Sequence, residues 1–436
     1  MNQDSRINRR RSEWNLEPGG HPLAKTERPI AIVPEEALGS VFIPRAMLHP
    51  TVYRKRITRI EGSPKAGDWV SVYSTEGSAT PQLFGYGLYN DRAEIAVRMM
   101  RWWGNPPDDA FIDELLDRAI SLRCEWLRLD KSTDAYRLIH AEADGFPGLV
   151  VDRYADTLSA EVFSLGMFQR SRSIIERLAA KLGTKHWLIQ PSPMFLSQEG
   201  YDATSFSSEG LPASVVVQEW GTKFRVQFES SHKTGFFCDQ RENRLKLAEL
   251  CEGKSVLDLC CYTGGFSVQA AKLGKAAEVI GVDLDEDPLK VAKKNADLNQ
   301  VRIKFAQSDA FAYMRDMQRL GRKFDIVVLD PPKLIRSRNE YEEGAKKHFD
   351  LNRLAMQLVR PGGFLLTCSC AGLLPDHEFL QIIRSAAKAT GYDADGQPCP
   401  PRSAQIVWRH GAAADHPVLA HCPETDYLKS LWVRLW

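Results

Sequence analysis

The stretch Ser255-Val-Leu-Asp-Leu-Cys-Cys-Tyr-Thr-Gly-Gly265 decides the fold of this chain. A short apolar run leads to an acidic residue and then to a pair of glycines, a pattern typical of a buried strand followed by a tight turn. From about residue 240 onward, short apolar strands alternate regularly with amphipathic helices. Such alternation predicts an α/β domain with a doubly wound parallel sheet that helices cover on both faces.

Two further regions precede this domain and show different patterns. Short β-branched and aromatic runs, separated by Gly, Pro, Asn and Asp, predict a small β-barrel or sandwich over residues 41–104. Helical and strand-like segments are mixed over residues 105–220, which predicts a central α+β domain. Residues 1–40 are expected to form a disordered or extended tail, because their first part is polar and rich in Arg, Asn, Gly and Pro. The α/β domain then takes residues 221–436.

Composition narrows the class of protein. The chain has 436 residues, of which 43% are hydrophobic and 26% are charged, as in a globular protein of two or three domains. It lacks both a long uncharged apolar run and the apolar core of a secretory signal, so we expect a cytoplasmic protein without a membrane span. The nine cysteines are irregularly spaced, which indicates reduced thiols rather than disulfides or a zinc site.

Acidic residues follow the predicted strands of the α/β domain, at the edge where such sheets bind ligands. Asp258 is followed 25 residues later by Asp283, whose carboxylate can accept hydrogen bonds from both hydroxyls of a ribose. Asp309 ends the third strand and is suited to an adenine edge, and Asp330-Pro-Pro-Lys333 ends the fourth. The chain has neither a G-x-G-x-x-G motif nor a G-x-x-x-x-G-K-[ST] phosphate loop.

The order of these motifs resembles class I S-adenosylmethionine-dependent methyltransferases, which have a Rossmann-like catalytic domain. The alternative is a dinucleotide enzyme with a degenerate glycine motif. The resemblance narrows at Leu366-Thr-Cys-Ser-Cys-Ala-Gly-Leu373, which is similar to the nucleophile motif of RNA cytosine-carbon-5 methyltransferases. More closely, the chain resembles the RlmI family, which methylates cytosine in large-subunit (23S) ribosomal RNA.

Four further segments carry this resemblance: His232–Arg241, Tyr136–Gly148, Asp415–Val418 and Tyr427–Lys429. The similarity runs from about residue 42 onward. It implies an N-terminal PUA domain, a linking α+β domain and a Rossmann-like catalytic domain.

Methylation at carbon 5 of cytosine explains why a cysteine is needed. Carbon 5 is a poor nucleophile, and a thiolate that adds to carbon 6 turns the ring into an enamine that can attack the methyl group. We assign the nucleophile to Cys370, directly before Ala-Gly-Leu, although strand alternation alone does not separate it from Cys368. Asp330 would hydrogen-bond the base, and Lys333 would counter phosphate charge or help to ionise the thiol.

The segment His232–Arg241 resembles the family's motif over the cofactor. By that resemblance Lys233 and Thr234 would contact the methionine carboxylate, whereas the alternative is an ordinary loop with a helix cap at Asp239. The full predicted site for S-adenosylmethionine, with no metal, consists of Lys233, Thr234, Gln240, Arg241, Asp258, Tyr262, Thr263, Gly264, Gly265, Asp283, Asp309 and Asp330.

The β domain is the predicted RNA anchor. Although the net charge is only +1, residues 41–103 hold nine Lys and Arg against five Asp and Glu. A local basic face of this kind suits RNA contact, with a merely solvated surface as the alternative. At Thr51 the sequence departs from the family, which usually has an aromatic residue there. The candidates for phosphate contact are Arg45, Arg54, Lys55 and Arg56.

Three other functions are compatible with the same motifs. The protein could methylate carbon 5 of uracil or a base nitrogen, bind RNA during ribosome assembly without catalysis, or methylate a small molecule. A requirement for Cys370 separates carbon methylation from nitrogen methylation. The expected partner is RNA, with no obligate protein partner, and the chain would act as a monomer or homodimer.

Overall fold

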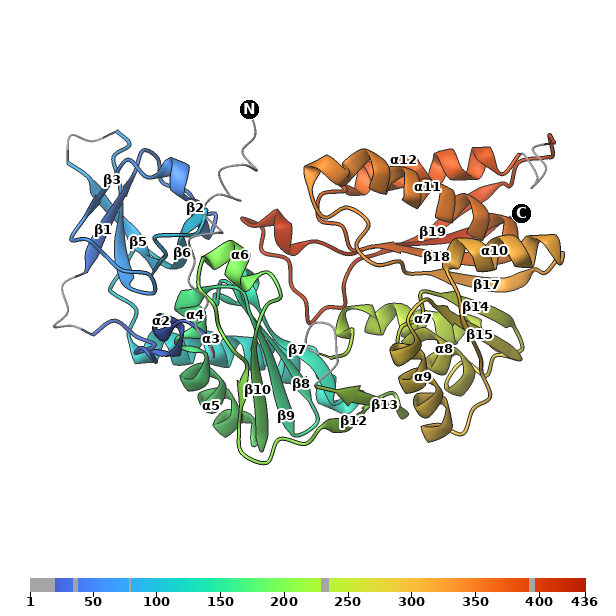
Figure 1. Ribbon diagram of the computed structural model, residues 1–436, viewed down its shortest axis with the longest axis horizontal. Coiled ribbons are helices and arrows are strands. Elements are labelled where there is room, and N and C mark those ends of the chain that lie inside the picture. The colour runs from blue at the N-terminus through green and yellow to red at the C-terminus, as the bar shows by residue number, and fades with distance from the viewer. Residues whose placement is uncertain (1–19, 34–37, 78–79, 229–234, 392–396) are drawn as a thin grey trace. The chain divides into compact units, whose positions relative to one another are not determined.

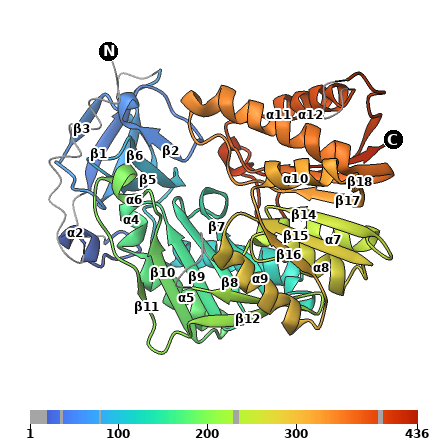
Figure 2. The same ribbon diagram turned by 45° about the vertical axis from the view of Figure 1, so that its right-hand side comes forward.

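The computed structural model describes residues 20–33, 38–77, 80–228, 235–391 and 397–436 (Figures 1 and 2). The chain divides into two compact units, each with its own core. Unit 1 comprises the residues up to 215 together with 226–236 and 415–425. Unit 2 comprises 216–225, 237–414 and 426–436. The domain boundaries predicted above are linear, whereas these units interleave along the chain.

The first part of unit 1 is a six-stranded sheet with the order β2-β6-β5-β4-β1-β3. Valines such as Val41, Val70 and Val97 are fully buried in its core. Glycine is required where β5 lies against β6, because a Cβ at Gly85 would lie 2.2 Å from the carbonyl oxygen of Arg101. The predicted small β domain is thereby confirmed. Its strands are β1 (Gly39–Ile43), β2 (Thr51–Tyr53), β3 (Arg59–Glu61), β4 (Trp69–Ser74), β5 (Gln82–Tyr89) and β6 (Ile95–Trp102).

The second part of unit 1 is a five-stranded sheet with the order β11-β10-β9-β8-β7. Its helices are α3 (Asp109–Ile120), α4 (Leu165–Phe168), α5 (Ser171–Leu182) and α6 (Phe195–Glu199). Asp108 caps α3 by accepting a hydrogen bond from the amide of Phe111 at 2.9 Å. After α3 the chain continues as a π-helix at Ser121–Trp126. The strands are β7 (Ala135–His140), β8 (Leu149–Tyr154), β9 (Thr157–Val162), β10 (His186–Pro191) and β11 (Phe206–Ser207).

Part of the predicted tail is ordered. Within residues 20–33 the chain forms the short helix α2 (Pro22–Lys25), and Ala24 and Ile30 are each only 4% exposed in the core of unit 1. Burial of these apolar side chains offsets the polar composition that predicted disorder. The prediction for residues 1–40 is therefore corrected for 20–33, while 1–19 and 34–37 lie outside the described residues.

Unit 2 is built on a seven-stranded sheet with the order β16-β15-β14-β17-β18-β20-β19. The first five strands in this order are parallel, as predicted, but β20 (Lys429–Leu435) and β19 (Ala404–His410) extend the sheet in the antiparallel sense. The sheet is therefore mixed. The parallel strands are β14 (Ser255–Leu259), β15 (Glu278–Asp283), β16 (Lys304–Gln307), β17 (Phe324–Leu329) and β18 (Val359–Ser369).

Helices cover both faces of this sheet, as the alternating pattern predicted (Figure 1). One face carries α10 (Ala310–Arg319), α11 (Tyr341–Leu358) and α12 (Asp376–Ala389). The other face carries α7 (Arg241–Leu250), α8 (Gly265–Lys272) and α9 (Glu286–Leu298). Among the described residues, no helix combines the length and the apolar character needed to cross a bilayer.

A buried ion pair fixes part of a hairpin to unit 2. The hairpin consists of β12 (Ser214–Glu219) and β13 (Thr222–Gln227). Arg244 on α7 donates two hydrogen bonds to the Glu219 carboxylate, at 2.6 and 2.8 Å, and both side chains are almost completely buried. This charge-assisted, two-nitrogen contact sets where the hairpin lies on unit 2.

A second buried arginine holds residues 415–425 in unit 1. Arg123 is fully buried, and its guanidinium donates to both oxygens of Asp144 at 2.7 and 2.8 Å. The same guanidinium donates to the carbonyl of Asp415 at 2.7 Å, and the Asp415 carboxylate accepts from the amide of Arg137 at 2.8 Å. These contacts explain why a segment so late in the sequence belongs to unit 1.

We expect Arg123→Met to lower the free energy of unfolding by about 3–5 kcal/mol, because it leaves the Asp144 carboxylate buried without its guanidinium partner. The matched control Arg118→Met removes an exposed ion pair with Glu114 on α3 and should cost about 0.5 kcal/mol or less. Urea denaturation followed by tryptophan fluorescence measures both values. Equal costs for the two variants would contradict an anchoring role for Arg123.

Candidate active site

The parallel strands of unit 2 end at one edge of the sheet, and the predicted site residues follow them there. The strand register aligns Leu259 with Val282 and Leu329, and Leu329 with Thr367. Because neighbouring strands lie about 4.8 Å apart, the segments that follow them meet at this edge. The site therefore draws on the loop after β14, the end of β15, and the turns after β16, β17 and β18.

The backbone conformation of the loop after β14 is suited to close contact between the main chain and a ligand. Cys260, Tyr262 and Gly264 all have positive φ, at 60°, 49° and 79°. Glycine adopts this conformation freely, but a residue with a side chain does so at a cost of about 1 kcal/mol or more. The amide of Tyr262 donates to Asp283 at 2.7 Å, and Asn295 donates to the carbonyl of Thr263 at 3.0 Å. The loop is therefore held in a strained form by its neighbours, as is common at ligand sites.

Asp258, near the end of β14, forms hydrogen bonds with the segment that follows this loop. Its side chain is fully buried, and Oδ2 accepts hydrogen bonds from the amide and the hydroxyl of Ser267 at 2.9 and 2.6 Å. Burial raises the pKa of Asp258 to about 7, against the effect of these hydrogen bonds, and the nearby Asp330 and Asp283 add to the rise. Oδ1 has no hydrogen-bond partner among the described residues, so it fits a donor from a bound ligand or water.

Two further acids lie at the ends of β15 and β16. Asp283 accepts from the amides of Tyr262 and Asp285, one at each carboxylate oxygen, at 2.7 and 3.0 Å. A carboxylate oxygen has a second acceptor position, so the two ribose hydroxyls predicted for this site remain compatible with the geometry. Asp309 is exposed and caps α10 by accepting from the amide of Ala312 at 3.0 Å. Asp309 thus caps a helix in this structure, and its contact with adenine stays a prediction.

A chain of buried polar side chains connects the turn after β17 with β20. Gln240 donates to Oδ2 of Asp330 at 3.0 Å and accepts at 2.7 Å from Asn243, which also donates to the hydroxyl of Ser430 at 3.1 Å. The sulfur of Cys368 lies 3.3 Å from the same hydroxyl. Gln240, predicted to line the cofactor site, thus orients Asp330 in this structure. Asn243 and Ser430 were missed by the sequence analysis, because neither stands in a motif.

The two cysteines of β18 have different surroundings. Cys368 is completely buried, which raises its pKa far above the ordinary value for a thiol, and the Asp330 charge raises it further. Cys370 is half-buried and follows the last residue of the strand, Ser369. A nucleophile must be both ionisable and accessible, so this difference favours Cys370 where strand alternation could not decide.

The remaining predicted residues of the α/β domain fall into three groups. Lys233 and Thr234 lie outside the described residues. Arg241 is only 1% exposed at the start of α7, and Gly265 begins α8. Lys333 is exposed after β17. The edge of the sheet therefore brings together Asp258, Tyr262, Thr263, Gly264, Asp283, Asp330 and Cys370.

The predicted RNA contacts of the β domain are not equivalent. Arg45, Lys55 and Arg56 are exposed, and Arg45 pairs with Glu76 at 3.2 Å on the surface. Arg54 is half-buried, and its guanidinium donates to the carbonyls of Asn90 at 2.7 Å and Ala93 at 2.8 Å. Arg54 therefore has a structural role in the β domain, and its contact with phosphate stays a prediction.

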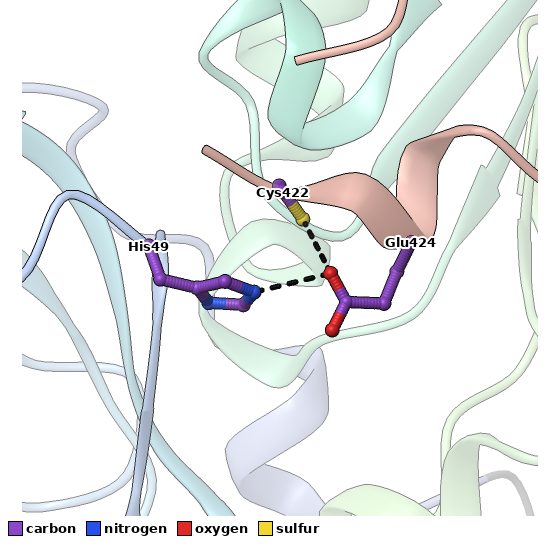
Figure 3. A group of neighbouring side chains, drawn as sticks. All are labelled: His49, Cys422 and Glu424. Carbon is purple, nitrogen blue, oxygen red and sulfur yellow. Dashed lines mark hydrogen bonds and ion pairs between the residues drawn. The ribbon is translucent and has the colours of Figure 1, made fainter. Parts of the chain in front are cut away.

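One cluster of side chains in unit 1 has the composition of a metal site (Figure 3). Nε2 of His49 lies 3.2 Å from Glu424, and the Cys422 thiol donates to the same carboxylate oxygen at 3.5 Å. The amide of the buried Thr51 donates to Nδ1 of His49, so the ring proton is on Nε2, where a metal would need a lone pair. Burial raises the pKa of Cys422 to about 12. The cluster is best described as a hydrogen-bonded anchor for residues 422–424.

Comparison with known proteins agrees with this geometry. A family model described as S-adenosylmethionine-dependent methyltransferase matches residues 173–392, and a PUA-like domain matches residues 47–102. The ribosomal RNA large subunit methyltransferase I of Vibrio cholerae is 36% identical over 388 residues, which cover 87% of this chain and 94% of that protein. The protein of the same name from Aeromonas hydrophila is 36% identical over 396 residues, or 88% of this chain and 95% of its own.

Solved structures show the same fold at low identity. A Streptococcus mutans protein described as a SAM-dependent methyltransferase has a TM-score of 0.73 and 18% identity, covering 91% of this chain and 99% of its own. A methyltransferase solved with SAH has a TM-score of 0.72 and 19% identity, covering 88% and 95%. The Rossmann-like domain, the PUA-like domain and the cofactor S-adenosylmethionine are thus established. The chain belongs to the ribosomal RNA large subunit methyltransferase I family.

Proposed function

We propose that this protein transfers the methyl group of S-adenosylmethionine to carbon 5 of cytosine in large-subunit ribosomal RNA, through a covalent adduct on Cys370. The observation that carries the proposal is a half-buried cysteine directly after β18, next to the strand β17, which is followed by an oriented aspartate, Asp330. Methylation of a base nitrogen has no use for such a thiol. Family membership supports RNA as the substrate.

The residues at the strand ends fit the cofactor. S-adenosylmethionine supplies an electrophilic methyl group when it is bound. The strained loop 260–265 would approach it with its backbone, Asp283 would bind the ribose, and Asp309 would lie toward the adenine. The orphaned oxygen of Asp258 is a buried acceptor that a bound ligand or a water would satisfy.

The addition to the substrate base, its orientation and the binding of a nearby phosphate are assigned to residues of this chain. The Cys370 thiolate adds to carbon 6, which moves electron density to carbon 5 and makes it nucleophilic. Asp330, held by Gln240, would hydrogen-bond the amino group or ring nitrogen of cytosine and so orient the ring. After methyl transfer a base removes the proton from carbon 5, the electron pair re-forms the ring double bond, and the thiolate leaves. Lys333 would pair with a phosphate near the flipped-out base.

The β domain would bind the RNA backbone through exposed cations. Arg45, Lys55 and Arg56 are the exposed candidates, and Arg54, which is half-buried, is the fourth. RNA in the cytoplasm is the expected target, and the oligomeric state, monomer or homodimer, stays a prediction.

Cys370→Ala should abolish methyl transfer, because no other residue in the proposed mechanism can activate carbon 5. The control Cys368→Ala removes a buried thiol of the same strand and should retain most activity. The assay uses labelled S-adenosylmethionine and unmodified large-subunit RNA, with the methylated nucleoside identified by mass spectrometry. Formation of 5-methylcytosine that is lost only in Cys370→Ala supports the proposal. Another methylated nucleoside, or full activity without Cys370, contradicts it.

Asp283→Ala should weaken binding of S-adenosylmethionine by about 10- to 100-fold, because hydrogen bonds to a charged group contribute about 1.5–3 kcal/mol. Asp287→Ala, on the exposed side of α9, is the control and should bind normally. Isothermal titration calorimetry measures both dissociation constants. Unchanged affinity in Asp283→Ala would remove this residue from the cofactor site.

The double variant Lys55→Ala/Arg56→Ala should weaken RNA binding and reduce its dependence on salt. Each lost phosphate contact lowers the slope of log affinity against log salt by about 0.7–0.9, so the slope should fall by up to about 2. The control Arg118→Ala removes an exposed cation from α3. Filter binding at several salt concentrations measures the slope, and an unchanged slope would exclude these two residues from the RNA surface.

A further inference from the structure

The turn that follows the nucleophile strand is held by a buried lysine. Lys429 begins β20, which pairs with β18 so that Lys429 lies opposite Ser369, the residue before Cys370. Its side chain is buried, with the whole residue only 7% exposed. Nζ donates to the carbonyl of Ala371, the residue directly after Cys370, at 2.9 Å, and to the carbonyl of Tyr427 at 3.1 Å.

A buried ammonium in this position is unusual, since burial of a charge is costly without compensation. Burial is the largest effect on the pKa of Lys429 and lowers it, whereas Asp376, Asp426 and Cys370 raise it and Lys333 lowers it. The net effect lowers the pKa of Lys429, and the two carbonyl acceptors and these negative neighbours favour the charged form against it. The interaction with Cys370 is reciprocal, because a cation that gains from a thiolate also stabilises that thiolate.

We propose that Lys429 is the positioning residue for the nucleophile: its ammonium fixes the turn after Cys370 and stabilises the Cys370 thiolate. The proposal rests on the proposed function in taking Cys370 as the nucleophile. Lys429 is linked to Cys370 through the carbonyl of the adjacent residue and stands on a strand that packs directly against β18. Lys333 is exposed and so belongs to a part of the site where water screens its charge.

Among the described residues, the other charged or titratable groups around this turn lie on α11, on α12, before β20 and after β17, together with the neutral thiol of Cys368 on β18. His348 on α11 lies 3.2 Å from the hydroxyl of Ser369, and burial followed by the Lys429 charge lowers its pKa to about 4. It is therefore neutral near pH 7 and does not compete as a cation. Asp376 at the start of α12 and Asp426 before β20 are exposed, and Asp330 lies after β17. These carboxylates disfavour a thiolate, and within the part of the chain that the structure describes Lys429 is a buried cation placed to oppose them.

The test measures thiol ionisation directly. The full-length protein, without RNA, is treated with iodoacetamide between pH 5.5 and 9.5, and alkylation of Cys370 is followed by peptide mass spectrometry. In Lys429→Met we expect about tenfold slower alkylation at pH 7 and equal rates at high pH, because a thiol pKa raised by one unit reduces the thiolate about tenfold. Lys429→Arg should restore most of the rate. Cys399, half-buried elsewhere in the same chain, is the internal reference and should not change.

Three results would overturn the proposal. The first is an unchanged pH profile in a Lys429→Met protein that melts cooperatively. The second is equal slowing at every pH, since that indicates altered access rather than charge. The third is slower alkylation of Cys370 in Lys333→Met but not in Lys429→Met. Should Lys429→Met fail to fold, Lys429→Gln replaces it: the amide can still donate a hydrogen bond to the Ala371 carbonyl but carries no charge, so Cys370 should again alkylate more slowly at pH 7, and an unchanged rate would contradict the proposal. Alkylation does not depend on RNA, so failure of the cytosine assignment and failure of this inference are separate outcomes.

Discussion

The parallel register of β14, β17 and β18 is the constraint on which the site depends. Leu259, Leu329 and Thr367 stand side by side, so the chain leaves three neighbouring strands at the same level. The strained loop after β14 and the cysteine turn after β18 therefore flank Asp330. Cofactor chemistry and base chemistry can then share one edge of the sheet, because backbone pairing sets the relative positions of the segments that carry the two groups of residues.

A second level of order comes from buried hydrogen bonds. Asp330, Gln240, Asn243 and Ser430 form a chain that runs from the turn after β17 to β20. In a low-dielectric interior such a chain of hydrogen bonds is rigid when every donor and acceptor has a partner. Removal of one side chain leaves its neighbour without a hydrogen bond. The carboxylate that would hold the base is thus fixed by buried side chains, of which Asn243 and Ser430 stand outside the motifs, so the site extends beyond the motifs.

The sequence was sufficient for those parts of the fold and site that are encoded locally. Alternating strands and helices predicted the five parallel strands, and residues such as Asp258, Asp283 and Cys370 stand at strand ends because that position follows from the strand itself. Pairing of β18 with β20 was not predictable in this way, since it joins segments about 60 residues apart through tertiary contact. The same limit applies to Arg54: its charge suggested RNA, but the carbonyls of Asn90 and Ala93 that engage it are visible only in the folded chain.

The strand order of unit 2 has a consequence for biosynthesis. Among the described strands β20 comes last in the chain, yet it lies between β18 and β19. A ribosome therefore releases β18 and β19 before the strand that joins them, and the sheet stays incomplete until residues 429–435 emerge. Lys429 arrives with that final strand. A chain in which β20 has not yet paired with β18 therefore lacks the contact between Lys429 and the carbonyl of Ala371, so the turn after Cys370 is completed only in the last step of sheet assembly.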